Sequence, residues 1–135
     1  MLLRAEGLYK AFDNITVLND ITFHVNPGEV VSIVGKSGAG KTTVLRCITG
    51  LEKCDKGVIE INGKYICSME NNTIKRASKQ QLYEVRKDLG MVFQNYHLFP
   101  HLTVAENVTL ALTEVYKMPK SEALQKAKAM LTQLD

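Results

Sequence analysis

The sequence predicts an α/β fold with an added antiparallel β layer and the start of a helical lobe. Three observations carry this prediction. A short, β-rich apolar run at residues 30–34 leads into a glycine-rich segment and then into a helical pattern. Strand-like stretches with turn signals occur on both sides of this unit. Two helical patterns follow from about residue 100, which predicts a second lobe there.

The first strands are predicted at residues 2–9 and 21–25, on either side of a polar bend at Asp13-Asn14. Residues 26–29 have the composition of a turn that leads into the strand at 30–34, which we expect to be buried and parallel. Residues 58–61 and 64–66 flank Asn62-Gly63, the strongest short hairpin signal in the chain. Residues 67–79 are polar without a clear period and are predicted to lie on the surface.

The later part begins with a predicted helix at residues 80–88 and a strand at 89–93, directly before Gln94. Thr103 and Glu106 have the spacing of a capping box, which predicts a helix to about residue 115. Ser121 is predicted to cap a second helix. Its apolar stripe runs toward Asp135 without a stop signal and is formed by Leu124, Ala127, Leu131 and Leu134.

The most informative segment has the phosphate-loop pattern G-x-x-x-x-G-K-[ST], written here as Gly35-Lys36-Ser37-Gly38-Ala39-Gly40-Lys41-Thr42. Its glycines allow main-chain N–H groups to approach anionic oxygens closely. Lys41 can reach the β- and γ-phosphates, and the Thr42 hydroxyl can ligate Mg²⁺. A helix at residues 42–49, with Gly50 as its stop, adds its positive dipole end. A chance glycine-rich turn is the alternative, but strand, loop and helix occur in the right order for a nucleoside triphosphate site.

Composition excludes several other classes of function. The net charge of +3 across 135 residues gives no argument for nucleic acid binding. The basic stretch at residues 75–87 is predicted to form a solvated face. No apolar run has the length of a membrane span, so a cytoplasmic chain that can dock onto a membrane partner is expected. The odd cysteine count fits reduced thiols. His97 and His101 are assigned structural or surface roles, because Pro100 opposes a helix between them.

Several blocks together resemble the N-terminal half of an ABC transporter ATP-binding subunit, closest in pattern to importers of polar amino acids. The phosphate loop (Walker A) continues through Thr43, and Met91-Val92-Phe93-Gln94 resembles the family's glutamine loop. Residues 98–107, with the sequence LFPHLTVAEN, resemble the segment that follows it. The resemblance covers the whole chain in order. It implies a P-loop NTPase core with an incomplete parallel sheet, an antiparallel layer and a truncated helical subdomain.

The resemblance also implies roles for individual residues. Phe12 would stack on adenine, with a core packing role as the alternative. Gln94 would reach Mg²⁺ and the attacking water, so that Lys41 and Gln94 are the expected catalytic residues and Thr42 and Gln94 the metal ligands. The expected ATP-binding set is Phe12, Gly35, Lys36, Ser37, Gly38, Ala39, Gly40, Lys41, Thr42 and Thr43. Residues 1–96 would form the nucleotide-binding core and residues 97–135 the start of the helical subdomain.

Three elements of the family pattern are not found in these 135 residues. They are the signature segment, the Walker B strand ending in Asp-Glu, and the switch histidine. The intact subunit is therefore expected to hydrolyse ATP, while this stretch alone is expected to be inactive. Three functions remain open: the ATP-binding part of an ATPase subunit that imports a polar solute, a nucleotide- or partner-binding fragment without hydrolysis, and a small-molecule kinase.

The resemblance also implies partners and a location. The intact subunit would pair head to tail with a second ATP-binding subunit and would bind transmembrane permease subunits, with residues 96–101 near that contact. It would lie in the cytoplasm, peripheral on the inner face of the cell membrane, with no nucleic acid partner.

Overall fold

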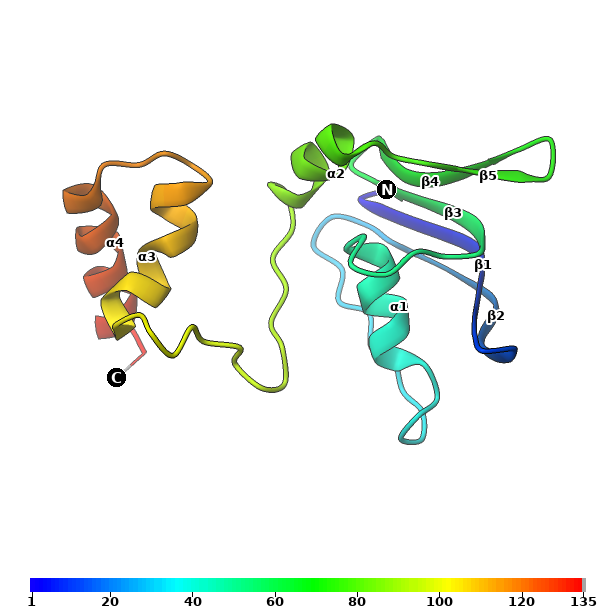
Figure 1. Cartoon of the computed structure of the whole chain (residues 1–135), viewed down its shortest axis with the longest axis horizontal. Coiled ribbons are helices and arrows are strands. Elements are labelled where there is room, and N and C mark those ends of the chain that lie inside the picture. The colour runs from blue at the N-terminus through cyan, green and yellow to red at the C-terminus, as the bar shows by residue number, and fades with distance from the viewer. Residues whose placement is uncertain (135) are drawn as a thin grey trace. The chain divides into compact units, whose positions relative to one another are not determined.

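The computed structural model describes residues 1–134 and divides the chain into two compact units (Figure 1). The first unit is Met1–Met91, and the second begins at Val92. The first unit contains the strands and two helices, and the second unit contains two helices. The predicted end of the apolar stripe at Asp135 lies outside the described residues.

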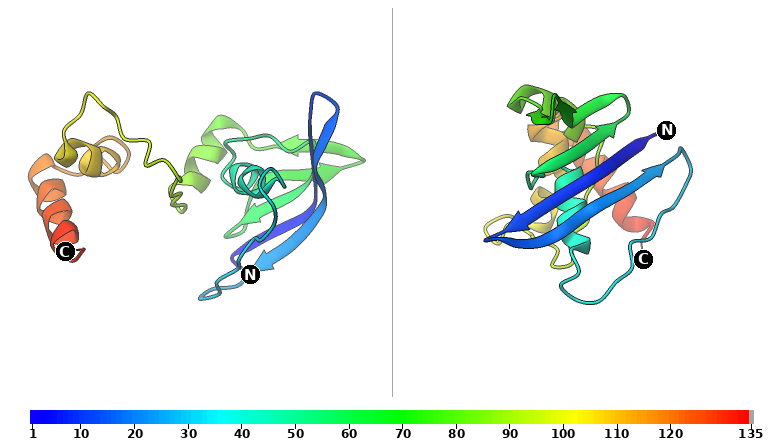
Figure 2. Two further views of the ribbon diagram at one scale, coloured as in Figure 1. Left: turned by 90° about the horizontal axis from the view of Figure 1, so that it is seen from below. Right: turned by 90° about the vertical axis from the view of Figure 1, so that its right-hand side faces the viewer.

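A five-stranded antiparallel sheet forms the first unit, with the strand order β2-β1-β3-β4-β5. Helix α1 lies against one face of this sheet (Figure 2), and α2 packs beside β4. The element bounds are β1 Leu3–Phe12, β2 Ile15–Val25, α1 Lys41–Ile48, β3 Lys56–Ile61, β4 Lys64–Glu70, β5 Thr73–Arg76 and α2 Lys79–Arg86. The predicted antiparallel layer and the helices predicted at residues 42–49 and 80–88 are therefore confirmed.

Three hairpins join these strands through two-residue turns in which both residues have positive φ. This φ pattern belongs to the turns whose twist matches the right-handed twist of paired strands. The turns are Asp13-Asn14, Asn62-Gly63 and Asn71-Asn72. The hairpin predicted at Asn62-Gly63 is confirmed, whereas the third turn and β5 were missed. Residues 67–79 lie mostly on the surface as predicted, with only Cys67 buried, but the strand pairing that extends through most of them was not predicted.

The hydrophobic core lies between α1 and the sheet. Ala5, Leu8, Leu18 and Ile59 contribute the fully buried side chains of the strands, and Val44 is the buried residue of α1 nearest its start. Each buried leucine or isoleucine contributes about 1.5–3 kcal/mol relative to an exposed one. This packing fixes α1 on the sheet although the helix is only 8 residues long.

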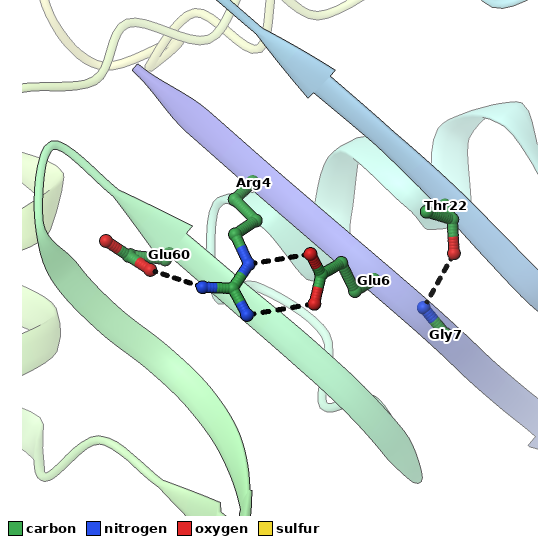
Figure 3. Close-up of polar contacts among 5 residues, drawn as sticks. All are labelled: Arg4, Glu6, Gly7, Thr22 and Glu60. Atoms are coloured by element: carbon green, nitrogen blue, oxygen red, sulfur yellow. Dashed lines mark hydrogen bonds and ion pairs between the residues drawn. The ribbon is translucent and has the colours of Figure 1, made fainter. Parts of the chain in front are cut away.

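Polar pairs cover part of β1 and β3. Figure 3 shows the Arg4 guanidinium between two carboxylates, with Nε 2.8 Å from Glu6 and Nη1 3.3 Å from Glu60. The hydrogen bond with Arg4 lowers the pKa of Glu6. On the other side of β1, the Gly7 N–H donates to Thr22 Oγ1 at 2.9 Å. These contacts tie β1 to both neighbouring strands.

Two predicted strands are absent from the described residues. Residues 30–34 and 89–93 are irregular, and Val30 and Val34 are 91% and 88% exposed. Every strand pair within residues 1–134 is antiparallel, so the prediction of a buried parallel strand and of an incomplete parallel sheet is wrong for this structure. The apolar pattern predicts burial, but a strand also needs a neighbour for its N–H and C=O groups, and no described residue supplies one.

The second unit contains α3 (Val104–Glu114) and α4 (Lys120–Thr132). The capping box is confirmed, since Glu106 N donates to Thr103 Oγ1 and Thr103 N donates to the Glu106 carboxylate. The cap predicted at Ser121 is wrong, because the N-cap of α4 is Pro119, two residues earlier, and Ser121 lies within the helix. Ala127 is buried as predicted, but the larger members of the stripe are exposed, namely Leu124, Leu131 and Leu134. Ala123 takes the other buried position.

None of the helices within residues 1–134 combines the length and the apolar character that crossing a bilayer requires.

Gly57 provides a test of the β1–β3 pairing. Its φ is +113°, and a Cβ there would lie 2.8 Å from the carbonyl oxygens of Glu6 and Gly7. Gly57→Ala is expected to destabilise the first unit by more than the roughly 1–3 kcal/mol of backbone strain alone, because the methyl group also meets backbone. Urea unfolding followed by far-UV circular dichroism measures the effect.

Gly63→Ala is the matched control, since Gly63 also has a positive φ (76°) but has nothing within 4 Å of its added Cβ. This variant should lose only the stability that corresponds to backbone strain at a positive φ, because its methyl group meets no other atom. Equal losses of stability for the two variants would contradict the packing argument.

Candidate functional site

The phosphate loop enters α1 through two glycines in the left-handed region. Gly38 has φ 80° and Gly40 has φ 89°, conformations that residues with a Cβ rarely adopt. Gly40 is also buried, and a Cβ there would lie 2.9 Å from the carbonyl oxygen of Val17 and 3.0 Å from Leu18. The loop therefore ends in direct contact with β2, and this contact requires glycine.

Lys41 turns its side chain back into the loop. Its Nζ donates to the carbonyl oxygens of Gly35 at 2.9 Å and Lys36 at 2.7 Å. The Ala39 N–H donates to the Lys36 carbonyl at 3.2 Å, which closes the loop on itself. A positive charge thus lies inside the curve of the loop, where an anion would be attracted.

The start of α1 is suited to an anion. Gly40, its N-cap, offers no side chain to accept from the first-turn N–H groups, and the first turn contains no acidic residue. Uncapped N–H groups and the positive end of the helix dipole are both favourable for phosphate. Val44, Cys47 and Ile48 are buried and anchor the other side of the helix.

Thr42 is exposed and Thr43 half-buried in this first turn, so the Thr42 hydroxyl is accessible to a ligand. Hydroxyl oxygen is a suitable donor for Mg²⁺, which is usually held by few protein ligands together with phosphate oxygens and water. Within residues 1–134, no three His, Cys, Asp or Glu side chains are arranged to hold a metal ion by themselves. The residues present therefore fit a metal that arrives together with a polyphosphate.

Phe12 ends β1 with a ring that is 41% exposed. Lys10 Nζ lies 4.7 Å from the centroid of that ring, within the range of a cation–π contact. Lys10 is itself buried and forms ion pairs with Glu52 at 3.1 Å and Asp55 at 3.5 Å. Burial alone would lower the pKa of Lys10, but the hydrogen bond with Glu52 and the charge of Asp55 outweigh it and raise the pKa of Lys10.

Asp55 holds the strand end that carries Phe12. Its carboxylate accepts a hydrogen bond from Ala11 N at 2.9 Å, and its own N–H donates to the Tyr9 carbonyl at 2.9 Å. This cluster of Lys10, Glu52 and Asp55 was not predicted from the sequence. No local signal could have revealed it, because the residues come from distant parts of the chain.

The strand register relates Phe12 to the phosphate loop. Phe12 is opposite Ile15 and Lys10 is opposite Leu18, while Gly40 contacts Val17 and Leu18. The ring and the end of the loop therefore lie at the same end of the β1–β2 hairpin. This arrangement suits a ligand with an aromatic part and a phosphate part.

Gln94 belongs to the second unit. It is exposed in the irregular stretch before α3, where the rings of Phe93 and His97 lie 4.7 Å apart. Its predicted role at the metal and the attacking water stays a prediction. The side chain of Asn107 orders part of the same stretch by accepting from Phe99 N and donating to the carbonyls of Phe99, Leu102 and Thr103.

Known proteins are similar to this chain in sequence. The chain is 42% identical over 130 residues to the glutamate transport ATP-binding protein GluA of Corynebacterium efficiens, covering 96% of this chain and 50% of that protein. It is also 42% identical over 130 residues to the arginine transport ATP-binding protein ArtM of Bacillus subtilis, with the same coverage. The chain thus spans about half the length of the curated relatives it matches.

Solved structures give the same relationship. The dimeric bacterial ABC transporter cassette MJ0796 superposes with a TM-score of 0.81 at 30% identity, covering 97% of this chain and 56% of that one. A post-hydrolysis structure of the same cassette, bound to ADP and Pi, gives a TM-score of 0.78 at 30% identity and the same coverage. The sequence profile of the family described as ABC transporter matches residues 18–135. This chain belongs to the ABC transporter family.

Proposed function

We propose that the chain is the ATP-binding part of an ABC transporter ATPase subunit that powers the import of a polar amino acid. The observation that carries the proposal is the phosphate loop, in which Lys41 is enclosed by carbonyls at the uncapped start of α1. The names of two relatives support an amino acid as the solute, because these proteins are named for the transport of glutamate and of arginine. A glycine-rich turn that occurs by chance would not be expected to combine an enclosed lysine with the uncapped start of a helix.

In this proposal the triphosphate enters the curve of the loop. The N–H groups of residues 36–43 donate to phosphate oxygens, and Lys41 exchanges its carbonyl partners for the β- and γ-phosphates. Mg²⁺ bound together with the nucleotide would neutralise part of the phosphate charge. Thr42 would hold it, and the metal role of Gln94 stays a prediction from the family resemblance.

Phe12 would stack on the base at the end of the same hairpin. Stacking on a π face is tolerant of base identity, so Phe12 would add affinity with little selectivity. The ion pairs of Lys10 with Glu52 and Asp55 support this role by holding the strand end beneath the ring. Residues 1–96 are assigned to the nucleotide-binding core and residues 97–135 to the start of the helical subdomain.

The proposed partners are a second ATP-binding subunit in a head-to-tail dimer and membrane permease subunits, on the inner face of the cell membrane. The dimeric structure of MJ0796 supports the first partner. ATP would join the two subunits, and hydrolysis would release them and transmit the motion to the permease.

The second candidate is a fragment that binds nucleotide without hydrolysing it. The coverage of the relatives favours this reading for the 135 residues taken alone, since the matched half contains no Walker B pair. Both candidates require nucleotide binding, and they differ only in turnover.

Lys41→Ala is expected to weaken MgATP binding to the 135-residue chain by about 30-fold or more, because a charged partner of the phosphates is removed. Isothermal titration calorimetry measures the affinity. Lys36→Ala is the matched control, because it removes a loop lysine whose backbone carbonyl, not side chain, bonds to Lys41. Unchanged binding by Lys41→Ala would sink both candidates.

Phe12→Ala is expected to weaken ATP and GTP binding alike, by about 5- to 150-fold, because stacking on one base is worth about 1–3 kcal/mol. Ile15→Ala at the opposite register position should leave both affinities unchanged. A change for only one of the two nucleotides would contradict stacking as the mode of recognition.

Turnover separates the two candidates. The 135-residue chain should bind MgATP and release no phosphate above background, whereas the full-length subunit should hydrolyse ATP in a Lys41-dependent manner. Lys41-dependent phosphate release by the 135-residue chain would contradict the expected need for the second half.

A further inference from the structure

Three buried thiols from separate parts of the chain line one cavity in the first unit. Cys47 lies in α1, Cys54 in the segment before β3, and Cys67 in β4, and each is at most 4% exposed. The cavity has a volume of about 70 Å³ for the centres of water molecules, where roughly 10–15 Å³ is enough to hold one water. The cavity opens to solvent, and its lining includes the exposed Lys53.

Cys54 is the central member of this thiol cluster. It lines the cavity together with both Cys47 and Cys67. Interaction with these two neighbouring thiols, together with burial, raises the pKa of Cys54. The interaction with Cys54 lowers the pKa of Cys47 and of Cys67, although burial opposes it. Of the three thiols, Cys47 and Cys67 are therefore the ones that ionise more readily.

The local backbone favours movement of Cys54 over movement of its neighbours. Cys67 is held in β4 between Ile59 of β3 and Arg76 of β5, and Cys47 is held within α1. Cys54 lies outside any helix or strand, with its carbonyl accepting a hydrogen bond from Arg76 at 2.8 Å. The segment that carries Cys54 is therefore less constrained by regular backbone pairing than the elements that carry its two neighbours. A buried cysteine is usually a small apolar side chain, and the cavity and the central position distinguish this one.

We propose that the thiol cluster is an oxidation site, in which hydrogen peroxide converts Cys54 and one of its two neighbours into a disulfide. The thiolate of Cys47 or Cys67 attacks the O–O bond, which gives a sulfenic acid and, after proton transfer, one water. The Cys54 sulfur then attacks the sulfenic sulfur, the S–S bond forms, and the hydroxyl leaves as a second water. Two thiols and one peroxide thus give one disulfide and two waters. The proposal is independent of the nucleotide site.

The experiment uses the 135-residue chain treated with hydrogen peroxide, denatured, and alkylated without reduction. The intact mass should show the loss of two hydrogen atoms and a single alkylated thiol. Peptide mapping should find a Cys47–Cys54 or a Cys54–Cys67 bridge. A Cys47–Cys67 bridge, or three alkylated or singly oxidised thiols, would overturn the proposal.

Single substitutions make the central role of Cys54 testable. Cys54→Ala should lose the bridge entirely, while Cys47→Ala and Cys67→Ala should each keep the bridge that the other neighbour provides. A bridge in Cys54→Ala overturns the proposal, and so does the loss of the bridge in both control variants. Far-UV circular dichroism confirms the fold of each variant. If Cys54→Ala does not fold, the two control variants alone still decide the question.

Discussion

The contact between Gly40 and β2 determines where the phosphate loop ends and where α1 begins. Main chain and side chain of Val17 and Leu18 occupy the space that any Cβ would need. The helix therefore begins at a fixed point on the sheet, and its buried face continues the same contact through Val44 into the core. The direction of the helix dipole, the position of Lys41 and the orientation of the first-turn N–H groups all follow from this one close approach.

A second constraint acts at the other side of the candidate site. Asp55 joins the end of β1 to the start of β3 through both its carboxylate and its backbone N–H. Lys10 adds its ion pairs with Glu52 and Asp55 in a buried setting, where one missing partner would leave an uncompensated charge. The exposed ring of Phe12 is thus attached to a strand end that several polar contacts hold in place. A hairpin end of this kind can present a flat apolar face and a cationic loop side by side.

Local signals in the sequence predicted much of the fold. The capping box at Thr103, the turn at Asn62-Gly63 and the loop-to-helix transition at Lys41 depend on neighbours within a few residues, and the structure has all three. The run at residues 30–34 was wrongly predicted as a paired strand, because pairing depends on another strand that no local pattern can supply. The Lys10–Glu52–Asp55 cluster and the thiol cluster were missed for a related reason. Each joins residues that are far apart in the sequence, and only the sheet topology brings them together.

The enclosure of Lys41 has a consequence for the energetics of the loop. A polyanion that binds to a disordered loop must pay the conformational entropy of ordering it, which is about 1–2 kcal/mol for each backbone residue. Here the ammonium group already holds the loop curved by donating hydrogen bonds to the carbonyls of Gly35 and Lys36. The lysine thus acts as an internal template for its future ligand, and much of the ordering is completed when the protein folds.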